Sequence, residues 1–223
     1  MKGAMLDSYS TDEQRAFAQG VAQRFGLVPN FFLSARDAPE VTAKLWEFAK
    51  AAYVDTPIPS LFKERLFVYL SRFCGVRYCI TRHCAFLLGY GHAAGDPAAR
   101  AQTVAQAIRL LKTLPPWRCE FGAVLDGLEN AQVAASWPEP DSQLEDWIFA
   151  AATVVFVEPA RSDQARRALR QALGGKHFEM LMGLLAFIRT AHYWTLLHPE
   201  LELEDDVQAM LGLDEELARL PES

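Results

Sequence analysis

Apolar residues recur three and four positions apart along most of the chain, which is the spacing of one face of an α-helix. No segment alternates apolar and polar residues as a half-buried strand does, although "TVVFV" at 153–157 has a strand-like composition. We therefore predict an all-α fold. Its main helices are expected over residues 60–73, 77–88, 103–113, 142–158, 162–173 and 176–198, with a last short helix from about 205.

Capping residues and glycines mark where these helices begin and end. Ser142 with Glu145 three positions later forms a capping box, in which each residue satisfies a free backbone N–H of the other. Asp96 or Thr103 is suited to cap the helix that follows it. Gly75 is expected to separate two helices, because glycine readily adopts the backbone conformation that ends one.

Two blocks of the chain share the same order of features. Residues 60–92 and 162–198 each contain a capped helix, a break, and an apolar helix with a late histidine. This likeness predicts two related helical halves packed into a single all-helical domain over residues 1–223. Its core would be 60–91, and the second half would be about 142–213.

Charge and apolar runs narrow the classes of function. The 223 residues carry a formal net charge of -6, which argues against a nucleic-acid partner because phosphate binding needs a basic surface. The longest apolar run, at 148–157, is well short of the about 20 residues that span a bilayer, so we expect no membrane segment. The N-terminus lacks the apolar core of a signal peptide, which predicts a cytoplasmic protein.

The residues with the most distinctive chemistry lie between positions 64 and 84. Cys79 and His83 are four residues apart, so they share one face of a helix. Cys79 would lie in the first turn, where the helix dipole stabilises a thiolate, and the imidazole can accept the thiol proton. Glu64 reaches His83 if the chain folds back at Gly75. This arrangement predicts a reactive thiol at Cys79 with a Glu64–His83 proton relay.

Several other interpretations of the cysteines stay open. Buried cysteines are often small packed hydrophobes, and we expect this role for Cys84 and Cys119. Residues five apart on a helix have Cα atoms about 8 to 9 Å apart, too far for a Cys79–Cys84 disulfide. A Cys74–Cys79 bridge needs a tight bend at Gly75. A zinc site is the weaker alternative, so we expect no metal; its ligands would be Glu64, Cys79, His83 and Cys84.

The segment "KERLFVYLSRFCGVRYCITRHCAFLLGYG" resembles the signature of the alkyl hydroperoxidase D-like proteins, also called the carboxymuconolactone decarboxylase family. That signature has a glutamate, a helix with a serine, Cys-x-x-Cys-x-x-x-His, and a turn with glycine. The matching positions are Glu64, Ser71, Tyr78, Cys79 and His83. The resemblance implies a helical bundle in which Cys79 attacks a peroxide while His83 and Glu64 relay protons.

The first cysteine of the family pair is missing, because position 76 is Val76. The usual disulfide cannot form, which predicts a degenerate member of the family. Cys74 is a possible substitute as the resolving thiol. Otherwise Cys79 stops at the sulfenic acid or pairs with the thiol of a partner. A lactone decarboxylase with His83 as the base is a further alternative.

A looser resemblance covers "LVPNFFLSARDAPEV", "SLFKERLFVYLSRFC" and "AFIRTAHYWTLLHPELELEDDV". These segments resemble an N-terminal module that precedes PAS and histidine-kinase domains in some bacterial sensors. The alternative function is therefore a non-catalytic sensory or ligand-binding module with a signalling partner. Both interpretations imply a small-molecule substrate or ligand, a homo-oligomer and no cofactor, and the catalytic one also implies a thiol reductant.

The remaining site candidates are Ser71, Tyr78, His192 and Arg189, which we expect near a pocket. His192 and Arg189 are three residues apart on one helix and would share a face, which could line a pocket opposite Cys79. The alternative is that they belong to an aromatic core segment with polar ends.

Overall fold

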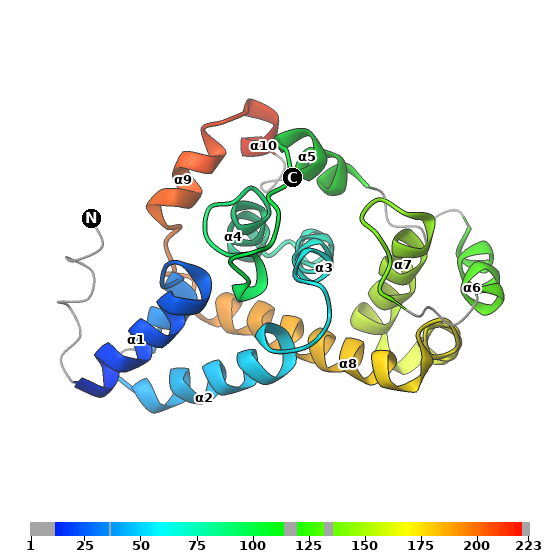
Figure 1. The fold of residues 1–223 in the computed structure, drawn as a ribbon, viewed down its shortest axis with the longest axis horizontal. Helices are drawn as coiled ribbons and strands as arrows, with labels where there is room; N and C mark the ends of the chain where they lie inside the picture. Colours follow the sequence, from blue (N-terminus) through cyan, green and yellow to red (C-terminus); the bar gives the residue numbers. More distant parts are fainter. Residues whose placement is uncertain (1–11, 36, 114–119, 132–135, 220–223) are drawn as a thin grey trace.

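The computed structural model describes residues 12–35, 37–113, 120–131 and 136–219. Within these ranges all regular structure is helical, which confirms the predicted all-α fold (Figure 1). The elements are α1 (Asp12–Phe25), η2 (Asn30–Leu33), α2 (Pro39–Ala49), the π-helix η3 (Lys50–Val54), α3 (Ser60–Phe73), α4 (Arg77–Leu87), η4 (Ala93–Gly95), α5 (Val104–Lys112), α6 (Phe121–Asn130), α7 (Gln143–Val157), η6 (Pro159–Arg161), α8 (Asp163–Leu197), α9 (Asp205–Leu211) and α10 (Glu215–Arg219).

Helices α3 and α4 lie at the centre and pack against each other (Figure 1). The long helix α8 passes along one side of this pair, with α1 and α2 at one end of the molecule and α6 and α7 at the other. Helix α9 packs on α4, and α10 packs on α5. The predicted relation between the two halves of the chain stays a prediction.

The turn between α3 and α4 is set by its backbone hydrogen bonds. Gly75 has φ +64°, and its N–H donates to the carbonyl of Arg72 at 3.1 Å. The N–H of Val76 donates to the carbonyl of Ser71, also at 3.1 Å. These two bonds form a Schellman motif, which ends α3 and lets α4 begin at once. The predicted break at Gly75 is confirmed.

Helix α8 contains a second glycine break. Gly174 has φ +72° and ψ 163° inside the helix, which separates the two helices predicted at 162–173 and 176–198. By length and composition α8 is apolar enough to cross a membrane, and 44% of that apolar window is buried inside the protein. The core helix of a soluble protein meets the same criterion, so this is weak support for a membrane span.

The predicted caps are partly confirmed. Thr103 and Gln106 form a complete capping box at the start of α5. Ser142 accepts a hydrogen bond from the backbone N–H of Glu145, but the carboxylate of Glu145 does not return one to Ser142. It binds Arg65 of α3 instead, so the predicted box is only half formed.

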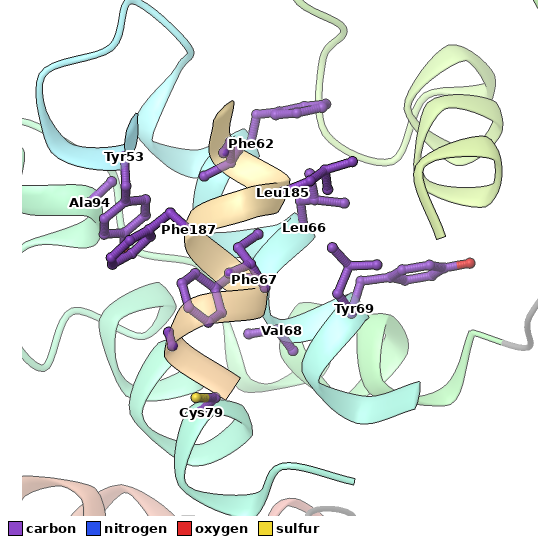
Figure 2. Packing of buried hydrophobic residues seen from close by; sticks show 14 of the residues in the cluster. Tyr53, Phe62, Leu66, Phe67, Val68, Tyr69, Cys79, Ala94, Leu185 and Phe187 are labelled. Atoms are coloured by element: carbon purple, nitrogen blue, oxygen red, sulfur yellow. The ribbon is translucent and has the colours of Figure 1, made fainter. Parts of the chain in front are cut away.

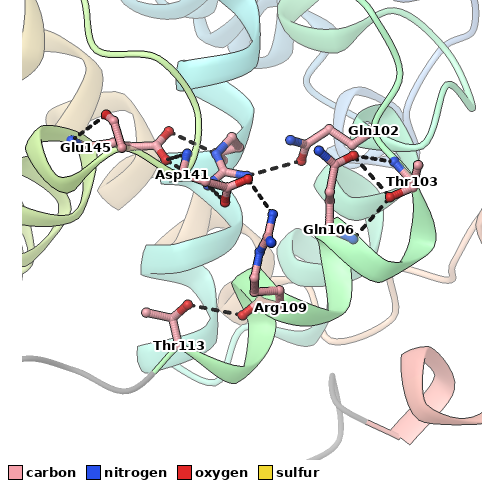
Figure 3. Close-up of polar contacts among 9 residues, drawn as sticks. Gln102, Thr103, Gln106, Arg109, Thr113, Asp141 and Glu145 are labelled. Atoms are coloured by element: carbon pink, nitrogen blue, oxygen red, sulfur yellow. Dashed lines mark hydrogen bonds and ion pairs between the residues drawn. The ribbon is translucent and has the colours of Figure 1, made fainter.

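Arg65 and Glu145 form a buried ion pair that joins α3 to α7. Figure 3 labels Glu145 and Asp141, the two acidic residues of this contact. The guanidinium donates from Nε and Nη2 to the two carboxylate oxygens at 2.9 and 2.7 Å. Nη2 also donates to Asp141 at 2.9 Å. Paired charged hydrogen bonds of this kind fix orientation. The contact therefore holds the central helix pair in one position against the second part of the chain.

The core between the central pair and α8 is rich in aromatic rings (Figure 2). Tyr53 of η3 stacks on Phe187 of α8 with ring centroids 5.4 Å apart, and Phe67 of α3 meets Tyr53 edge-on at 5.8 Å. Offset and edge-on arrangements are the preferred geometries of aromatic pairs. These rings form the surroundings of the candidate site.

Candidate functional site

Glu64 and His83 form the hydrogen bond predicted from the sequence. Glu64 Oε2 lies 2.6 Å from His83 Nδ1, and the Glu64 side chain is fully buried. The other carboxylate oxygen accepts from the hydroxyl of Tyr53 and, at 2.5 Å, from the N–H of Ala94. Burial and the negative charge of Glu64 raise the pKa of Tyr53, which stays protonated as a donor. The carboxylate is thus held by three donors from three further elements.

This contact determines which nitrogen of His83 can act as a base. A carboxylate only accepts, so Nδ1 carries a proton, and Nε2 is the nitrogen left to act as a base. In the described part of the chain no hydrogen bond joins His83 Nε2 to another group. The ring is stacked on Phe67 with centroids 3.5 Å apart, which fixes its plane. His83 is therefore fixed in orientation, with Nε2 as the nitrogen that is not hydrogen-bonded.

A small cavity of about 40 Å³ lies beside this pair. Its wall is mostly aromatic, and Tyr78 belongs to it as predicted. The residues that line it are Phe25, Pro29, Phe31, Phe32, Tyr53, Phe67, Tyr78, Cys79, Arg82, His83, Phe86, Phe187 and Ala191. Cys79 and His83 therefore face a common space, the position that a reaction at the thiol would need.

Cys79 does not have the stabilised thiolate that the sequence predicted. It is the third residue of α4, but it is only 2% exposed, and burial raises its pKa to about 12. Desolvation outweighs the helix dipole here. In the described residues no hydrogen bond joins Cys79 to His83; its Sγ lies 3.8 Å from Oγ1 of Thr195 instead. The resting thiol is protonated.

The other cysteines differ in exposure. Cys84 is buried in the core, as expected of a packing residue, and burial raises its pKa to about 12. Cys74 is partly exposed and near enough to Cys79 that a charge on Cys74 raises the pKa of the Cys79 thiol. Val76 is 3% exposed and packs in the core. Cys119 lies outside the described residues.

Ser71, His192 and Arg189 are not among the residues that line this cavity. Ser71 Oγ lies 2.7 Å from His192 Nε2, and both residues are buried. Arg189 donates to the carbonyl of Phe156 and lies over its ring, 4.3 Å from the centroid. The residues of α8 that line the cavity are Ala191, next to His192, and Phe187, one helical turn before Ala191.

Sequence reasoning missed Tyr53 and Thr195. Tyr53 lies eleven residues before Glu64 in a π-helix, and Thr195 lies 116 residues after Cys79. Tyr53 lies in none of the quoted segments, and the segment that contains Thr195 gives it no role. Spacing says nothing about contacts over such separations. An indirect signal exists for Tyr53 alone: a buried carboxylate needs donors, and tyrosine is one of the few neutral side chains that supply one.

The described residues contain no group of three or more His, Cys, Asp or Glu side chains placed to hold a metal ion. The polar groups of the residues that line the cavity are an imidazole, a thiol, a guanidinium and two phenols. Compared with protein-family models, with curated proteins and with solved structures, the chain matches none of them.

Proposed function

We propose that the protein is a thiol-based redox protein in which Cys79 reduces a peroxide with the help of the Glu64–His83 pair. The proposal rests on one observation: His83 Nδ1 is bound to a buried carboxylate at 2.6 Å while the residue shares a cavity with Cys79. A carboxylate partner raises the basicity of an imidazole and fixes its tautomer. The resemblance to the alkyl hydroperoxidase D-like family implies the same roles.

The raised pKa of Cys79 determines how the reaction would begin. A thiol with a pKa of about 12 is almost wholly protonated at neutral pH, so the proton must leave as the peroxide arrives. His83 Nε2 takes this proton while the sulfur attacks the nearer peroxide oxygen and the O–O bond breaks. The sulfur keeps one oxygen as a sulfenic acid. The proton passes from His83 to the leaving oxygen, which departs as water or an alcohol.

Cys74 is the proposed second thiol. Its sulfur attacks the sulfenic sulfur of Cys79, an S–S bond forms, and the hydroxyl leaves as water with the thiol proton. A dithiol reductant then returns both cysteines to thiols and is itself oxidised to a disulfide. Val76 is at the position where the resemblance would place this thiol, and it is buried in the core.

Intact-mass measurement after peroxide treatment tests the proposal. The fully reduced protein should lose two hydrogen atoms as the disulfide forms. Cys74→Ser should instead gain one oxygen atom, because the sulfenic acid has no partner. The mass of Cys79→Ser should not change on peroxide treatment, and the matched control Cys84→Ser should lose two hydrogen atoms like the wild type. If Cys79→Ser is oxidised to the same extent as the wild type, the proposal is contradicted.

A non-catalytic ligand-binding module is the second candidate, and the aromatic wall of the cavity favours it. Most of the lining residues are aromatic, as in sites that hold small ligands. For this candidate we expect no peroxide turnover. A small apolar ligand should raise the melting temperature by the same amount in the wild type and in Cys79→Ser. The redox proposal expects turnover that is lost in Cys79→Ser.

A further inference from the structure

The volume of the cavity limits what can reach Cys79. A single water molecule needs roughly 10 to 15 Å³ of cavity, and a cavity of about 150 Å³ holds benzene. The cavity beside Cys79 and His83 has about 40 Å³. It is larger than one water molecule needs and far smaller than an aromatic or branched alkyl group needs. A molecule of two or three heavy atoms fits this space.

The wall is held so that a single side-chain rotation does not enlarge it. Phe187 stacks on Tyr53 at 5.4 Å, and Phe25 stacks on Phe86 at 5.3 Å. Phe67 stacks on the ring of His83 at 3.5 Å. All of these rings are buried, and close-packed interiors resist such movement. The size limit is therefore a property of the packed wall.

Arg82 and His83 are the two polar residues of the wall whose nitrogens are not all hydrogen-bonded. Arg82 is 2% exposed, and its guanidinium is bound to Asp206 and to the carbonyl of Tyr90. Its Nε has no acceptor among the described residues. A buried N–H without a partner calls for an explanation such as a bound water or ligand. The Nε atom itself is closed off from a water-sized molecule, so His83 Nε2 is the group that offers a hydrogen bond, as an acceptor, to a molecule in the cavity.

We propose that this cavity makes Cys79 selective for hydrogen peroxide over organic hydroperoxides. This inference rests on the proposed thiol reaction and adds its substrate class. Hydrogen peroxide has two heavy atoms and can donate a hydrogen bond to His83 Nε2. In the reaction the thiol becomes a sulfenic acid and one oxygen leaves as water. An alkyl or aryl hydroperoxide carries a group that the cavity does not hold.

The test compares oxidants in single-turnover oxidation of the reduced wild-type protein. The rate of Cys79 oxidation is measured with hydrogen peroxide, tert-butyl hydroperoxide and cumene hydroperoxide. Each rate is divided by the rate of a free small-molecule thiol with the same oxidant. The normalised preference for hydrogen peroxide should be at least about tenfold, the size of discrimination that a tight pocket gives. Equal normalised rates would overturn the size limit.

Two substitutions in the wall sharpen the test. Phe187→Leu enlarges the cavity and should reduce the preference, by speeding oxidation with tert-butyl hydroperoxide. The matched control is Phe149→Leu, because Phe149 is equally buried but packs against Phe62 and Tyr69, away from the cavity. It should leave the preference unchanged. Ala191→Val fills the cavity and should slow oxidation by hydrogen peroxide itself.

The outcomes separate this inference from the proposed function. If every oxidant modifies Cys79 at the rate of an ordinary buried thiol, the redox function and the selectivity both fail. If hydrogen peroxide and the organic hydroperoxides are all reduced rapidly, the redox function stands and the selectivity fails. Because the wild-type comparison needs no substitution, a wall variant that does not fold leaves the test intact.

Discussion

The two buried histidines of the core make an instructive comparison, since they come from the two halves of the chain and lie against the same ring. His83 of α4 is stacked on Phe67 at 3.5 Å, and His192 of α8 meets Phe67 edge-on at 6.0 Å. His83 binds the carboxylate of Glu64, whereas His192 binds the hydroxyl of Ser71 at 2.7 Å. Only His83 lines the cavity.

Their partners explain the difference in what each histidine can do. Burial, with smaller effects from His83 and Arg189, lowers the pKa of His192 from 6.5 to about 3. Its Nδ1 has no partner among the described residues. His192 is therefore a neutral packing residue. A histidine becomes a useful base when a buried carboxylate fixes it and a cavity brings substrate to its free nitrogen, and only His83 meets both conditions.

The largest expected effect is on the rate of Cys79 oxidation. His83→Asn removes the base and should slow oxidation by hydrogen peroxide about 10² to 10⁴-fold, the usual contribution of general-base catalysis. His192→Asn should change the rate by less than about threefold, because His192 touches neither the thiol nor the cavity. Stopped-flow or quenched mass measurements give both rates. Equal losses in the two variants would remove the distinction between the histidines.

The second effect is on stability against pH. The folded protein keeps His192 neutral down to about pH 3, whereas the unfolded chain binds a proton near pH 6.5. The free energy of unfolding should therefore be unaffected by this group above pH 6.5. It should fall by roughly 1 kcal/mol per pH unit as the pH drops from there towards 3.

Urea unfolding at several pH values measures this contribution, with His192→Asn as the reference that removes the titrating group. The difference in free energy of unfolding between wild type and His192→Asn should shrink as the pH falls below 6.5. A difference that is constant between pH 7 and 4 would show that His192 titrates normally in the folded protein.

The third effect concerns the partner of each histidine. Ser71→Ala leaves His192 Nε2 without its buried hydrogen bond and should destabilise the protein by about 1 to 3 kcal/mol, with Cys79 oxidation unchanged. Glu64→Gln is the matched change at His83. It should slow Cys79 oxidation strongly, because an amide does not raise the basicity of the imidazole. Slow oxidation of Cys79 in the Ser71→Ala variant would show that the Ser71–His192 pair also takes part in the reaction.

The smallest effect is at Thr195, whose hydroxyl lies 3.8 Å from Cys79 Sγ and lowers the pKa of that thiol against the effect of burial. Thr195→Val should raise the pKa and slow alkylation of Cys79 by about fivefold, the value of one hydrogen bond near 1 kcal/mol. Thr195→Ser keeps the hydroxyl and should restore the rate. Failure of the serine variant to restore it would mean that packing alone is responsible.

The sequence predicted the fold and the Glu64–His83 contact because both follow from local rules. Helical periodicity and the glycine at position 75 specify a helix hairpin, and a hairpin of that length brings Glu64 opposite His83. The spacing of Cys79 and His83 likewise placed both at one cavity. Such inferences need only the geometry of two adjacent helices.

The rest depends on contacts that no local pattern contains. The raised pKa of Cys79 comes from burial beneath α8, and the role of Ser71 comes from His192, which is 121 residues away. The capping box at Ser142 is only half formed for a similar reason, because the carboxylate of Glu145 binds the distant Arg65. In each case a long-range partner changes the behaviour of a residue whose position was predicted correctly.

Site-resolved mass spectrometry of one sample of reduced wild-type protein treated with hydrogen peroxide tests the central claim most directly. Cys79 and Cys84 are both buried, with the pKa of each raised to about 12, so each is an internal control for the other. Only Cys79 shares the cavity with His83. We predict that Cys79 is oxidised first and that Cys84 stays a thiol. Oxidation of the two at equal rates would contradict activation by the Glu64–His83 pair.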